Sequence, residues 1–477
     1  MINIICEVSK YLIILFMVLY TIKCFSVMSS KDEDSKKKKL NKQIFYVFII
    51  HFLCYLTMYL RLQSVKILIF YGVQIFVAVF YMIIYHSIYK GSSRLLTNNS
   101  AFLLLIGYTI LTRLNFSLAV KQFIMATAGL FITAFIPYIM TKWKKLKDLG
   151  VFYGVFGILF LLTVFIPGLG IDKYGSRNWI HIGTFSLQPM EFVKILFVFF
   201  VASMLVKMDT FKDLMINAII SAAFMLVLVA EKDLGAAVIF YITYVCMVYL
   251  ATSRPVFLIG GMSLGVGAVM AGYILFKDTL FNHVLVRVEA WKDPFKYIDT
   301  GGYQVSQSLF AMGTGGYMGS GLTMGKANTI PVSESDFIFS AICEELGVIF
   351  GLALIMVFVS VFISFANVSM KCKNPFYKYV GTHKLESFGT IFVIQSLLNL
   401  GGVTKFIPST GVTLPLVSYG VSSVLSTLII FGIVQGVCVI NDKEAIRNEK
   451  ERERIRQQNI NSGGAVPPKR ARKVTQQ

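Results

Sequence analysis

The 477-residue sequence is 56% apolar and only 15% charged, yet its formal net charge is +20. Soluble domains average about 45–50% apolar residues, so this chain carries more apolar surface than one globular core can bury, and lipid must solvate much of it. The Lys and Arg residues gather at the ends of apolar runs instead of forming a basic stripe interleaved with aromatic residues. This placement argues against nucleic acid as a partner and indicates a membrane surface.

Thirteen apolar runs are long enough to cross a bilayer, which takes about 17–25 residues. The runs are 11–28, 44–61, 66–89, 101–119, 120–140, 150–167, 189–206, 214–230, 234–251, 255–276, 337–364, 384–406 and 420–440. The first run could also be a signal peptide, but no small-residue cleavage site follows it. We therefore expect an all-α polytopic membrane protein.

The connecting segments predict which side of the membrane each end occupies, because cytoplasmic loops carry an excess of Lys and Arg. The Lys-rich segments 31–43, 141–149 and 369–385 and the basic tail 441–477 all fall on one side when the spans are counted. Segments 168–188, 277–335 and 407–419 fall on the other side. We expect the N-terminus outside and the C-terminus in the cytoplasm. The tail begins as a charged, helix-compatible stretch and ends in a composition typical of disorder.

Several polar groups lie where membrane helices meet their connections, and such groups usually face a cavity or a partner. In segment 175–195, Glu191 and Lys194 are three residues apart on one helical face and can pair. This pair either orients the helix or belongs to a pocket, to which Arg177 adds a guanidinium suited to phosphate. Asp233 ends the Glu-Lys-Asp turn 231–233, which we interpret as a hairpin turn or as the rim of a polar pocket.

Two further segments interrupt the apolar pattern near the C-terminal half. Asp336 lies at the N-terminal end of a predicted span, where the helix dipole favours an anion and a cap is needed. Glu344 and Glu345 lie deeper in the span, so at least one of them should face the protein interior. Segment 404–423 contains two prolines and two glycines that cannot all fit one regular helix. It therefore predicts broken or re-entrant backbone that lines a cavity or is covered by protein.

The longest polar interruption, residues 277–335, contains few groups able to act as acid or base, among them Asp293 and Asp299. Its VSQSLFAM stretch predicts a helix lying at the membrane interface. The chain has no HExxH, P-loop or zinc spacing. We therefore expect carboxylate chemistry beside a basic pocket, which is compatible with a pyrophosphate-linked substrate.

Five segments resemble, in order, the signature segments of the SEDS family, the shape, elongation, division and sporulation proteins such as FtsW, RodA and SpoVE. The segments read GSRNWIHIG…QPMEFVK, EKDLGAA, GYQVSQSLFAMGTGGYMGSG, SDFIFSAICEELG and STGVTLPLVSYGVSS. The resemblance covers about residues 101–440 and implies a ten-helix core. Residues 1–100, with about three spans, lie outside that core.

The resemblance implies a peptidoglycan glycosyltransferase of the bacterial cytoplasmic membrane. Such enzymes polymerise lipid II, an undecaprenyl-pyrophosphate disaccharide-pentapeptide, on the outer face of the membrane. The implied partners are a class B penicillin-binding transpeptidase and other divisome or elongasome proteins. The donor carries its own leaving group, so one carboxylate and a few cations suffice for the chemistry.

The resemblance also implies roles for individual residues. The family's catalytic aspartate lies in a stretch like WxNPWxDPxGxGYQ, and here the stretch reads WKDPFKYIDTGGYQ. When Trp291 and Tyr303 are matched without a gap, Tyr297 occupies the aspartate position. We predict Asp299, two residues later, as the general base, with Asp293 as the second candidate. Val421 is a further departure, because the family commonly has a second glycine there.

The remaining site predictions concern substrate binding and a metal. The predicted substrate-binding residues are Arg177, Glu191, Lys194, Asp233, Glu345 and Lys405. Lys405 either contacts pyrophosphate or anchors the chain at the interface. No ligand pattern demands a cofactor, although a divalent cation (Mg or Mn) could bridge pyrophosphate to Asp299.

Two other functions remain open from the sequence. A lipid II flippase or transporter would also have many spans and a broken helix, but no inverted repeat is visible in the chain. An inactive scaffold of a division or elongation complex would be consistent with the displaced aspartate.

Overall fold

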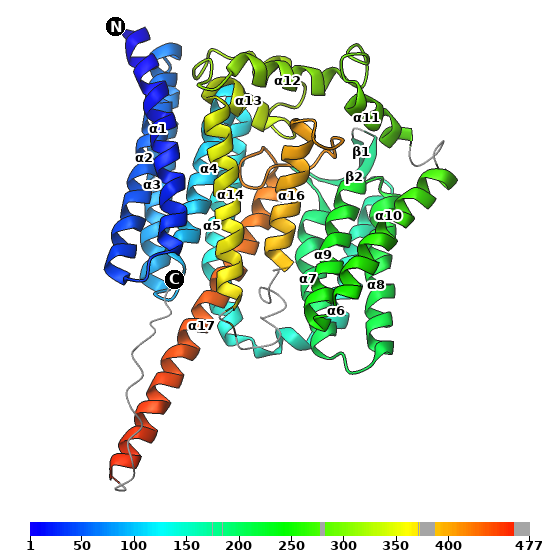
Figure 1. Cartoon of the computed structure of the whole chain (residues 1–477). Helices are drawn as coiled ribbons and strands as arrows, with labels where there is room; N and C mark the ends of the chain where they lie inside the picture. Colours follow the sequence, from blue (N-terminus) through cyan, green and yellow to red (C-terminus); the bar gives the residue numbers. More distant parts are fainter. Residues whose placement is uncertain (174, 184, 277–281, 371, 373–386, 462–477) are drawn as a thin grey trace.

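A computed structural model describes the chain except for residues 174, 184, 277–281, 371, 373–386 and 462–477. Within the described residues, eleven helices are long and apolar enough to cross a membrane, and two shorter apolar helices, Gly150–Phe165 and Ser387–Val403, accompany them. These helices correspond to the thirteen predicted runs and confirm the all-α polytopic membrane fold. Figure 1 shows most of them running side by side from one end of the molecule to the other.

The first three helices form an N-terminal unit at one edge of the molecule, in blue in Figure 1. They are α1 (Ile2–Met28), α2 (Glu33–Leu62) and α3 (Val65–Ile88). The Asp32 carboxylate accepts from the backbone nitrogen of Ser35 and caps α2. The N-terminus lies at the same end of the molecule as α11 and α12, whereas α17 projects from the opposite end.

The next seven helices form the first part of the core. They are α4 (Arg94–Leu114), α5 (Phe116–Lys142), α6 (Gly150–Leu162), α7 (Pro189–Val206), α8 (Phe211–Ala230), α9 (Leu234–Thr252) and α10 (Pro255–Phe276). Asn115 separates α4 from α5, because its side chain caps α5. The expected boundary between 119 and 120 was therefore misplaced by a few residues.

Three short strands connect α6 to α7, and the sequence did not predict them. Strands β1 (Gly170–Lys173), β2 (Ser176–Ile182) and β3 (Phe185–Leu187) form an antiparallel sheet in the order β1-β2-β3. Gly170 pairs with Ile180, and Ile180 pairs with Leu187 across the sheet. A Cβ atom on Gly170 would lie only 1.7 Å from the carbonyl oxygen of Val164, so no larger residue fits there.

The described part of the connection between α10 and α14 contains three α-helices, and it lies at the end of the molecule that also holds the sheet (Figure 1). We call it the outer connection after this end. They are α11 (Asn282–Lys292), α12 (Tyr303–Gly315) and α13 (Ile338–Leu346). Helix α12 lies across the ends of the spans, as expected for the VSQSLFAM stretch. Residues 277–281 of the predicted loop lie outside the described residues.

The last spans are α14 (Val348–Met370), α16 (Ser387–Val403) and α17 (Val421–Asn461). The run predicted at 337–364 is divided between α13 and α14 at Gly347, whose φ of +89° ends the first helix. Between α16 and α17, residues 404–420 are not helical, which confirms the predicted broken backbone. Helix α17 includes the charged start of the tail, while the predicted disordered end, 462–477, lies outside the described residues.

Polar side chains join the N-terminal unit to the core. The Tyr20 hydroxyl donates to Asn99 Oδ1 at 2.7 Å, and Asn99 Nδ2 donates to Ser360 Oγ at 2.9 Å, which links α1, α4 and α14. The Tyr55 and Thr112 hydroxyls lie 2.9 Å apart and link α2 to α4. Because such groups are costly in lipid without partners, these bonds fix how the unit docks on the core.

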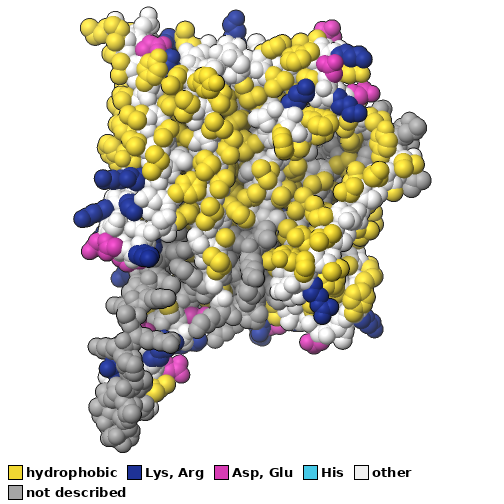
Figure 2. Space-filling model, viewed as in Figure 1, with side chains coloured by type: hydrophobic (Ala, Val, Ile, Leu, Met, Phe, Trp, Pro, Cys, Tyr) yellow, Lys and Arg dark blue, Asp and Glu magenta, His cyan; other side chains and the backbone are white. Residues whose placement is uncertain are grey.

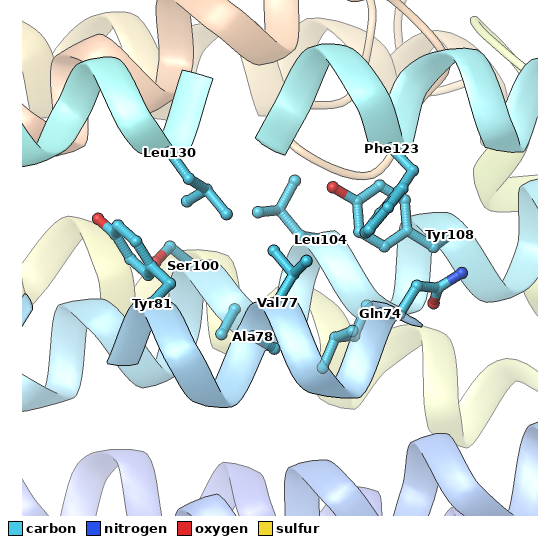
Figure 3. A pocket seen from close by; sticks show the side chains of 11 residues that line it. Gln74, Val77, Ala78, Tyr81, Ser100, Leu104, Tyr108, Phe123 and Leu130 are labelled. Carbon is cyan, nitrogen blue, oxygen red and sulfur yellow. The ribbon is translucent and has the colours of Figure 1, made fainter. Parts of the chain in front are cut away.

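A small apolar pocket lies between α3, α4 and α5 (Figure 3). Its described polar groups are bonded at the edges: Gln74 Nε2 donates to Tyr55 at 2.8 Å, and the Tyr81 and Thr133 hydroxyls lie 3.1 Å apart. On the face drawn in Figure 2, apolar side chains dominate the surface and the charged side chains gather toward the helix ends. The seven cysteines are all buried and form no disulfide.

Candidate active site at the outer end

The sheet places Arg177 and Asn178 beside the turn between α8 and α9. Two glycines with positive φ, Gly175 (+82°) and Gly183 (+63°), form the tight turns on either side of β2. The backbone nitrogen of Arg177 donates to the carbonyl oxygen of Glu231 at 3.0 Å, and its Nε donates to the carbonyl oxygen of Val164 at 3.1 Å. The half-buried Arg177 therefore ties the sheet to two helix ends.

Asp233 accepts three hydrogen bonds at this corner. Its Oδ2 accepts from Asn178 Nδ2 at 2.6 Å and from Gln188 Nε2 at 3.2 Å, and its Oδ1 accepts from the backbone nitrogen of Ala236 at 2.9 Å. Asp233 thus caps α9 and holds the sheet at the same time. Burial raises the pKa of its carboxyl, whereas the bonds from Ala236 and Asn178 oppose that rise.

The non-helical segment 404–420 contacts the same corner. A Cβ atom on Gly235 would lie 3.1 Å from the carbonyl oxygen of Thr410, so the start of α9 touches this segment directly. Gly411 has a φ of +71°. A Cβ atom there would lie 3.6 Å from Asp336 Oδ2 and 3.7 Å from Nη1 and Nη2 of Arg287. A carboxylate and a guanidinium therefore lie against the same glycine.

We refer to Asp233, Arg287, Asp336, Thr410 and Gly411 as the outer polar site, where "outer" denotes only the end of the molecule that holds α11 and α12 (Figure 1). The charge of Arg287 lowers the pKa of Asp233 and that of Glu191 raises it, so both groups lie within electrostatic range of the carboxyl. Two polar atoms in and around the site, Asn178 Oδ1 and Thr410 Oγ1, are buried without a hydrogen-bond partner. Unsatisfied buried groups of this kind are typical of a place that takes a ligand or water.

Helix α11 joins the outer polar site to the turn that carries the predicted base. Arg287 and Trp291 lie four residues apart and therefore share one face; they donate to the carbonyl oxygens of Ser409 at 3.4 Å and Lys405 at 3.0 Å. A neighbouring face contacts the glycine turn, since a Cβ atom on Gly301 would lie 2.6 Å from Val286 Cγ1.

The two predicted base candidates lie in the exposed turn after α11. Asp293 Oδ1 accepts from the backbone nitrogen of Lys296 at 3.2 Å. The Asp299 carboxylate is exposed, and among the described residues it forms no ion pair or hydrogen bond. Its assignment as general base stays a prediction, as does that of Asp293.

The predicted pair on α7 forms. Glu191 and Lys194 make an ion pair with both side chains almost fully buried. Lys194 Nζ also donates to Gln395 Oε1 at 3.0 Å, and the Ser426 hydroxyl donates to Glu191 Oε2 at 2.8 Å. The pair therefore connects α7 to α16 and α17, and it holds together the helices that carry the outer polar site.

Glu345 contacts Arg113 and the connection after α12. Its Oε1 lies 2.9 Å from Arg113 Nε, and its Oε2 accepts from the backbone nitrogen of Thr323 at 3.0 Å. Glu344 Oε1 accepts from the backbone nitrogen of Lys326 at 2.7 Å. Both glutamates are buried, as the sequence predicted for at least one of them, and they hold the connection after α12 in place. Substrate contact by Glu345 stays untested.

Sequence reasoning did not single out Arg287, although it lies in the predicted loop. The usable signal was its spacing of four residues from Trp291, which places a cation and an aromatic ring on one helix face. Lys405 has a φ of +60° and contributes its carbonyl to Trp291. The N-cap of α13 is Phe337, whereas the sequence predicted that Asp336 would cap this helix.

The described residues contain no group of three or more His, Cys, Asp or Glu side chains that could hold a metal ion. A divalent cation brought in with a pyrophosphate would therefore have few protein ligands, and its involvement stays a prediction.

Comparisons with known proteins match most of the chain. Residues 102–443 match the FtsW/RodA/SpoVE family, described as "Cell cycle protein". The chain is 33% identical over 334 residues to "Peptidoglycan glycosyltransferase RodA" of Mycobacterium bovis, covering 66% of this chain and 69% of the relative. It is 30% identical over 340 residues to "Probable peptidoglycan glycosyltransferase FtsW" of Bacillus subtilis, covering 69% and 82%.

A solved structure has the same fold. The chain superimposes with a TM-score of 0.61 and 21% identity on a structure described as "Structural coordination of polymerization and crosslinking by a peptidoglycan synthase complex", covering 73% of this chain and 98% of that chain. Helices α1–α3 precede the range matched by the family. On the family match and the curated relatives, this chain belongs to the FtsW/RodA/SpoVE (SEDS) family.

Proposed function

We propose that the protein is a peptidoglycan glycosyltransferase that polymerises lipid II at the outer face of the bacterial cytoplasmic membrane. The observation that carries this proposal is the family match over residues 102–443, together with 33% identity to relatives named for that activity. The outer polar site supports it, because it gathers a guanidinium and two carboxyl groups at one end of the membrane helices.

In the proposed reaction, the 4-hydroxyl oxygen of the acceptor sugar attacks the anomeric carbon of the donor. The bond from that carbon to the pyrophosphate oxygen breaks, and the pyrophosphate leaves with the electron pair. The hydroxyl proton passes to a carboxylate base, for which we propose Asp299, with Asp293 as the second candidate. The exposed position of Asp299 supports this role, because an acceptor sugar can reach an accessible carboxylate.

The leaving pyrophosphate needs positive charge close by. Arg287 is the cation that the outer polar site supplies, and a guanidinium can bind two phosphate oxygens at once. We propose Arg177 and Lys405 as further cations on the two sides of the site. Asp233 orders the corner between them, and the Glu191–Lys194 pair fixes the helices underneath.

The proposed orientation puts the outer polar site outside and α17 in the cytoplasm. The Lys-rich connection between α1 and α2 and the charged part of α17 lie at the end opposite to α11 and α12 (Figure 1). Positive charge favours the cytoplasmic side. The proposed partner is a class B penicillin-binding transpeptidase in a divisome or elongasome, which the likeness to a peptidoglycan synthase complex supports.

The test is to purify the full chain with its transpeptidase partner and supply labelled lipid II. Glycan chains on a gel are expected from the wild type, and chain formation should fall about 100-fold or more in Asp299→Ala. Asp172→Ala removes an equally exposed aspartate of the same end, on β1, and should leave the rate unchanged.

Three other results would revise the proposal. Chains that persist undiminished in both Asp299→Ala and Asp293→Ala would remove both base assignments. Transport of lipid II across liposomes without chain formation would favour the flippase. An absence of both activities, with an intact complex, would favour the scaffold. Addition of a chelator to the wild type tests the divalent cation.

A further inference from the structure

Glu231 is a buried carboxyl group that the proposed chemistry does not use. It follows the last residue of α8, outside the spans, and is only 1% exposed. Its carbonyl oxygen accepts from Arg177, so the backbone is firmly held by β2. Its side chain, by contrast, has a buried Oε1 atom without any hydrogen-bond partner.

The contrast with Asp233, two residues later, is sharp. The Asp233 carboxyl group accepts from three donors, on Asn178, Gln188 and Ala236. Among the described residues, the Glu231 carboxyl group forms no ion pair or hydrogen bond. The charged groups on the elements packed around this corner are Arg177 of β2, Lys232 and Asp233 of the turn itself, Glu191 of α7, Arg287 of α11 and Asp336 beside Gly411.

A buried carboxylate without donors is expensive, because its charge is desolvated and nothing replaces the lost water. A second negative charge next to it adds to that cost. Both effects act on Glu231: burial, followed by the charge of Asp233, raises its pKa to about 9. At neutral pH the Glu231 side chain is therefore an uncharged acid.

We propose that Glu231 is a positioning residue that works as an uncharged acid, so that the corner where Arg287 lies near Asp233 and Asp336 gains no further negative charge and the guanidinium stays available to an anionic substrate. This inference rests on the proposed function for its substrate, a pyrophosphate-linked sugar. Ionised Glu231 would place a further anion at the corner, attract the guanidinium and displace β2 from the turn.

The first test is the pH profile of glycan-chain formation for the wild type, Glu231→Gln and Glu231→Met. Both replacements are uncharged and similar in size. Activity of the wild type should fall as the pH rises toward about 9, whereas both variants should stay within about twofold of the wild type at pH 7 and extend their activity to higher pH. Glu289→Gln, an exposed glutamate on α11, should keep the alkaline fall of the wild type.

The second test measures thermal unfolding against pH and needs no activity. A carboxyl whose folded pKa lies above its unfolded value stabilises the fold fully below the unfolded pKa, near 4.5, and that stabilisation is lost as the pH rises to about 9. The melting temperature of the wild type should therefore fall across this window more than that of Glu231→Gln or Glu231→Met.

Two outcomes would overturn the inference. One is a folded Glu231→Gln protein whose activity at pH 7 is reduced about 100-fold, because a charged catalytic role would then be required. The other is an alkaline limb and a melting profile that are the same in the wild type and both variants. Failure of the proposed function looks different: no protein would form glycan chains, while the melting profiles would still separate.

Discussion

Arg287 Nη1 lies 3.4 Å from the carbonyl oxygen of Ser409, which connects α11 to the non-helical segment between α16 and α17. The two residues are separated by 122 positions in the chain. Their contact brings a cation from the outer connection to the backbone beside Gly411 and within electrostatic range of Asp233. A helix outside the spans thereby contributes directly to a site that the spans enclose.

Replacing Arg287 tests this contribution. Arg287→Ala should reduce glycan-chain formation by about 10²–10³-fold, because the leaving pyrophosphate loses a charge-assisted donor. Arg287→Lys should recover part of the rate, since an ammonium keeps the charge but cannot bind two oxygens in a planar fork. The measurement is the initial rate with labelled lipid II. Equal rates for Arg287→Ala and wild type would contradict the assigned role.

Gly411 should tolerate no side chain. Its φ of +71° costs an L-residue about 1–2 kcal/mol, and a methyl group would point toward Asp336 and Arg287. Gly411→Ala should therefore lower both the melting temperature and the rate. Gly313→Ala is the matched control, because a Cβ atom there meets nothing within 4 Å and its φ is ordinary for a helix. If the two variants behave alike, the geometry at Gly411 is not needed.

The buried pair on α7 predicts a large effect on stability. Lys194→Met leaves Glu191 buried without its cation and should destabilise the fold by about 3–5 kcal/mol. The double replacement Glu191→Leu with Lys194→Met should regain much of that loss, because no unpaired charge remains. Thermal unfolding in detergent measures both. Lys207→Met breaks the ion pair with Asp148, whose two side chains are 55% and 50% exposed, and should change stability by less than about 1 kcal/mol.

Arg113 should control the order of the connection after α12. It lies 2.9 Å from Glu345 Oε1 and donates from Nη2 to the carbonyl oxygen of Gly325 at 2.9 Å. Arg113→Ala should speed amide hydrogen exchange in residues 319–326, because two of the anchors of this connection are lost. Lys207→Ala, which breaks the exposed pair with Asp148 beyond the C-terminal end of α7, should leave exchange there unchanged. An unchanged exchange rate in Arg113→Ala would show that Glu344 and Glu345 suffice to hold the connection.

The spans and the family were accessible from the sequence because long apolar runs and ordered motifs are strong signals. The sheet was missed because its strands hold only three to seven residues and sit between membrane helices. Its signal was present in retrospect: the alternating NWIHI stretch lies between Gly175 and Gly183, the two glycines of the turns. The break at Gly347 was hidden because apolar residues continue on both sides of it.

The site was only partly accessible. Glu191 and Lys194 could be paired from their spacing, since i,i+3 neighbours on a helix meet. The contact of Arg287 with Ser409 could not be predicted, because nothing in local spacing relates residues from two different connections. Hydropathy likewise gave no way to distinguish the unpartnered Glu231 from Asp233 in the same three-residue turn. The roles of Asp299 and Asp293 stay predictions.

The contacts of Asn99 with Tyr20 and Ser360 have a consequence for how the protein enters the membrane. Helix α4 is the least apolar of the eleven long spans and is almost wholly buried. Its partners lie on both sides of it in the chain, on α1 and α2 before it and on α14 after it. During synthesis α1 and α2 are made before α4 and α14. They can therefore form hydrogen bonds with the amide and hydroxyl groups of α4 before α14 is made. The N-terminal unit can therefore supply hydrogen-bond partners to the first helix of the family core before the later helices of that core are made.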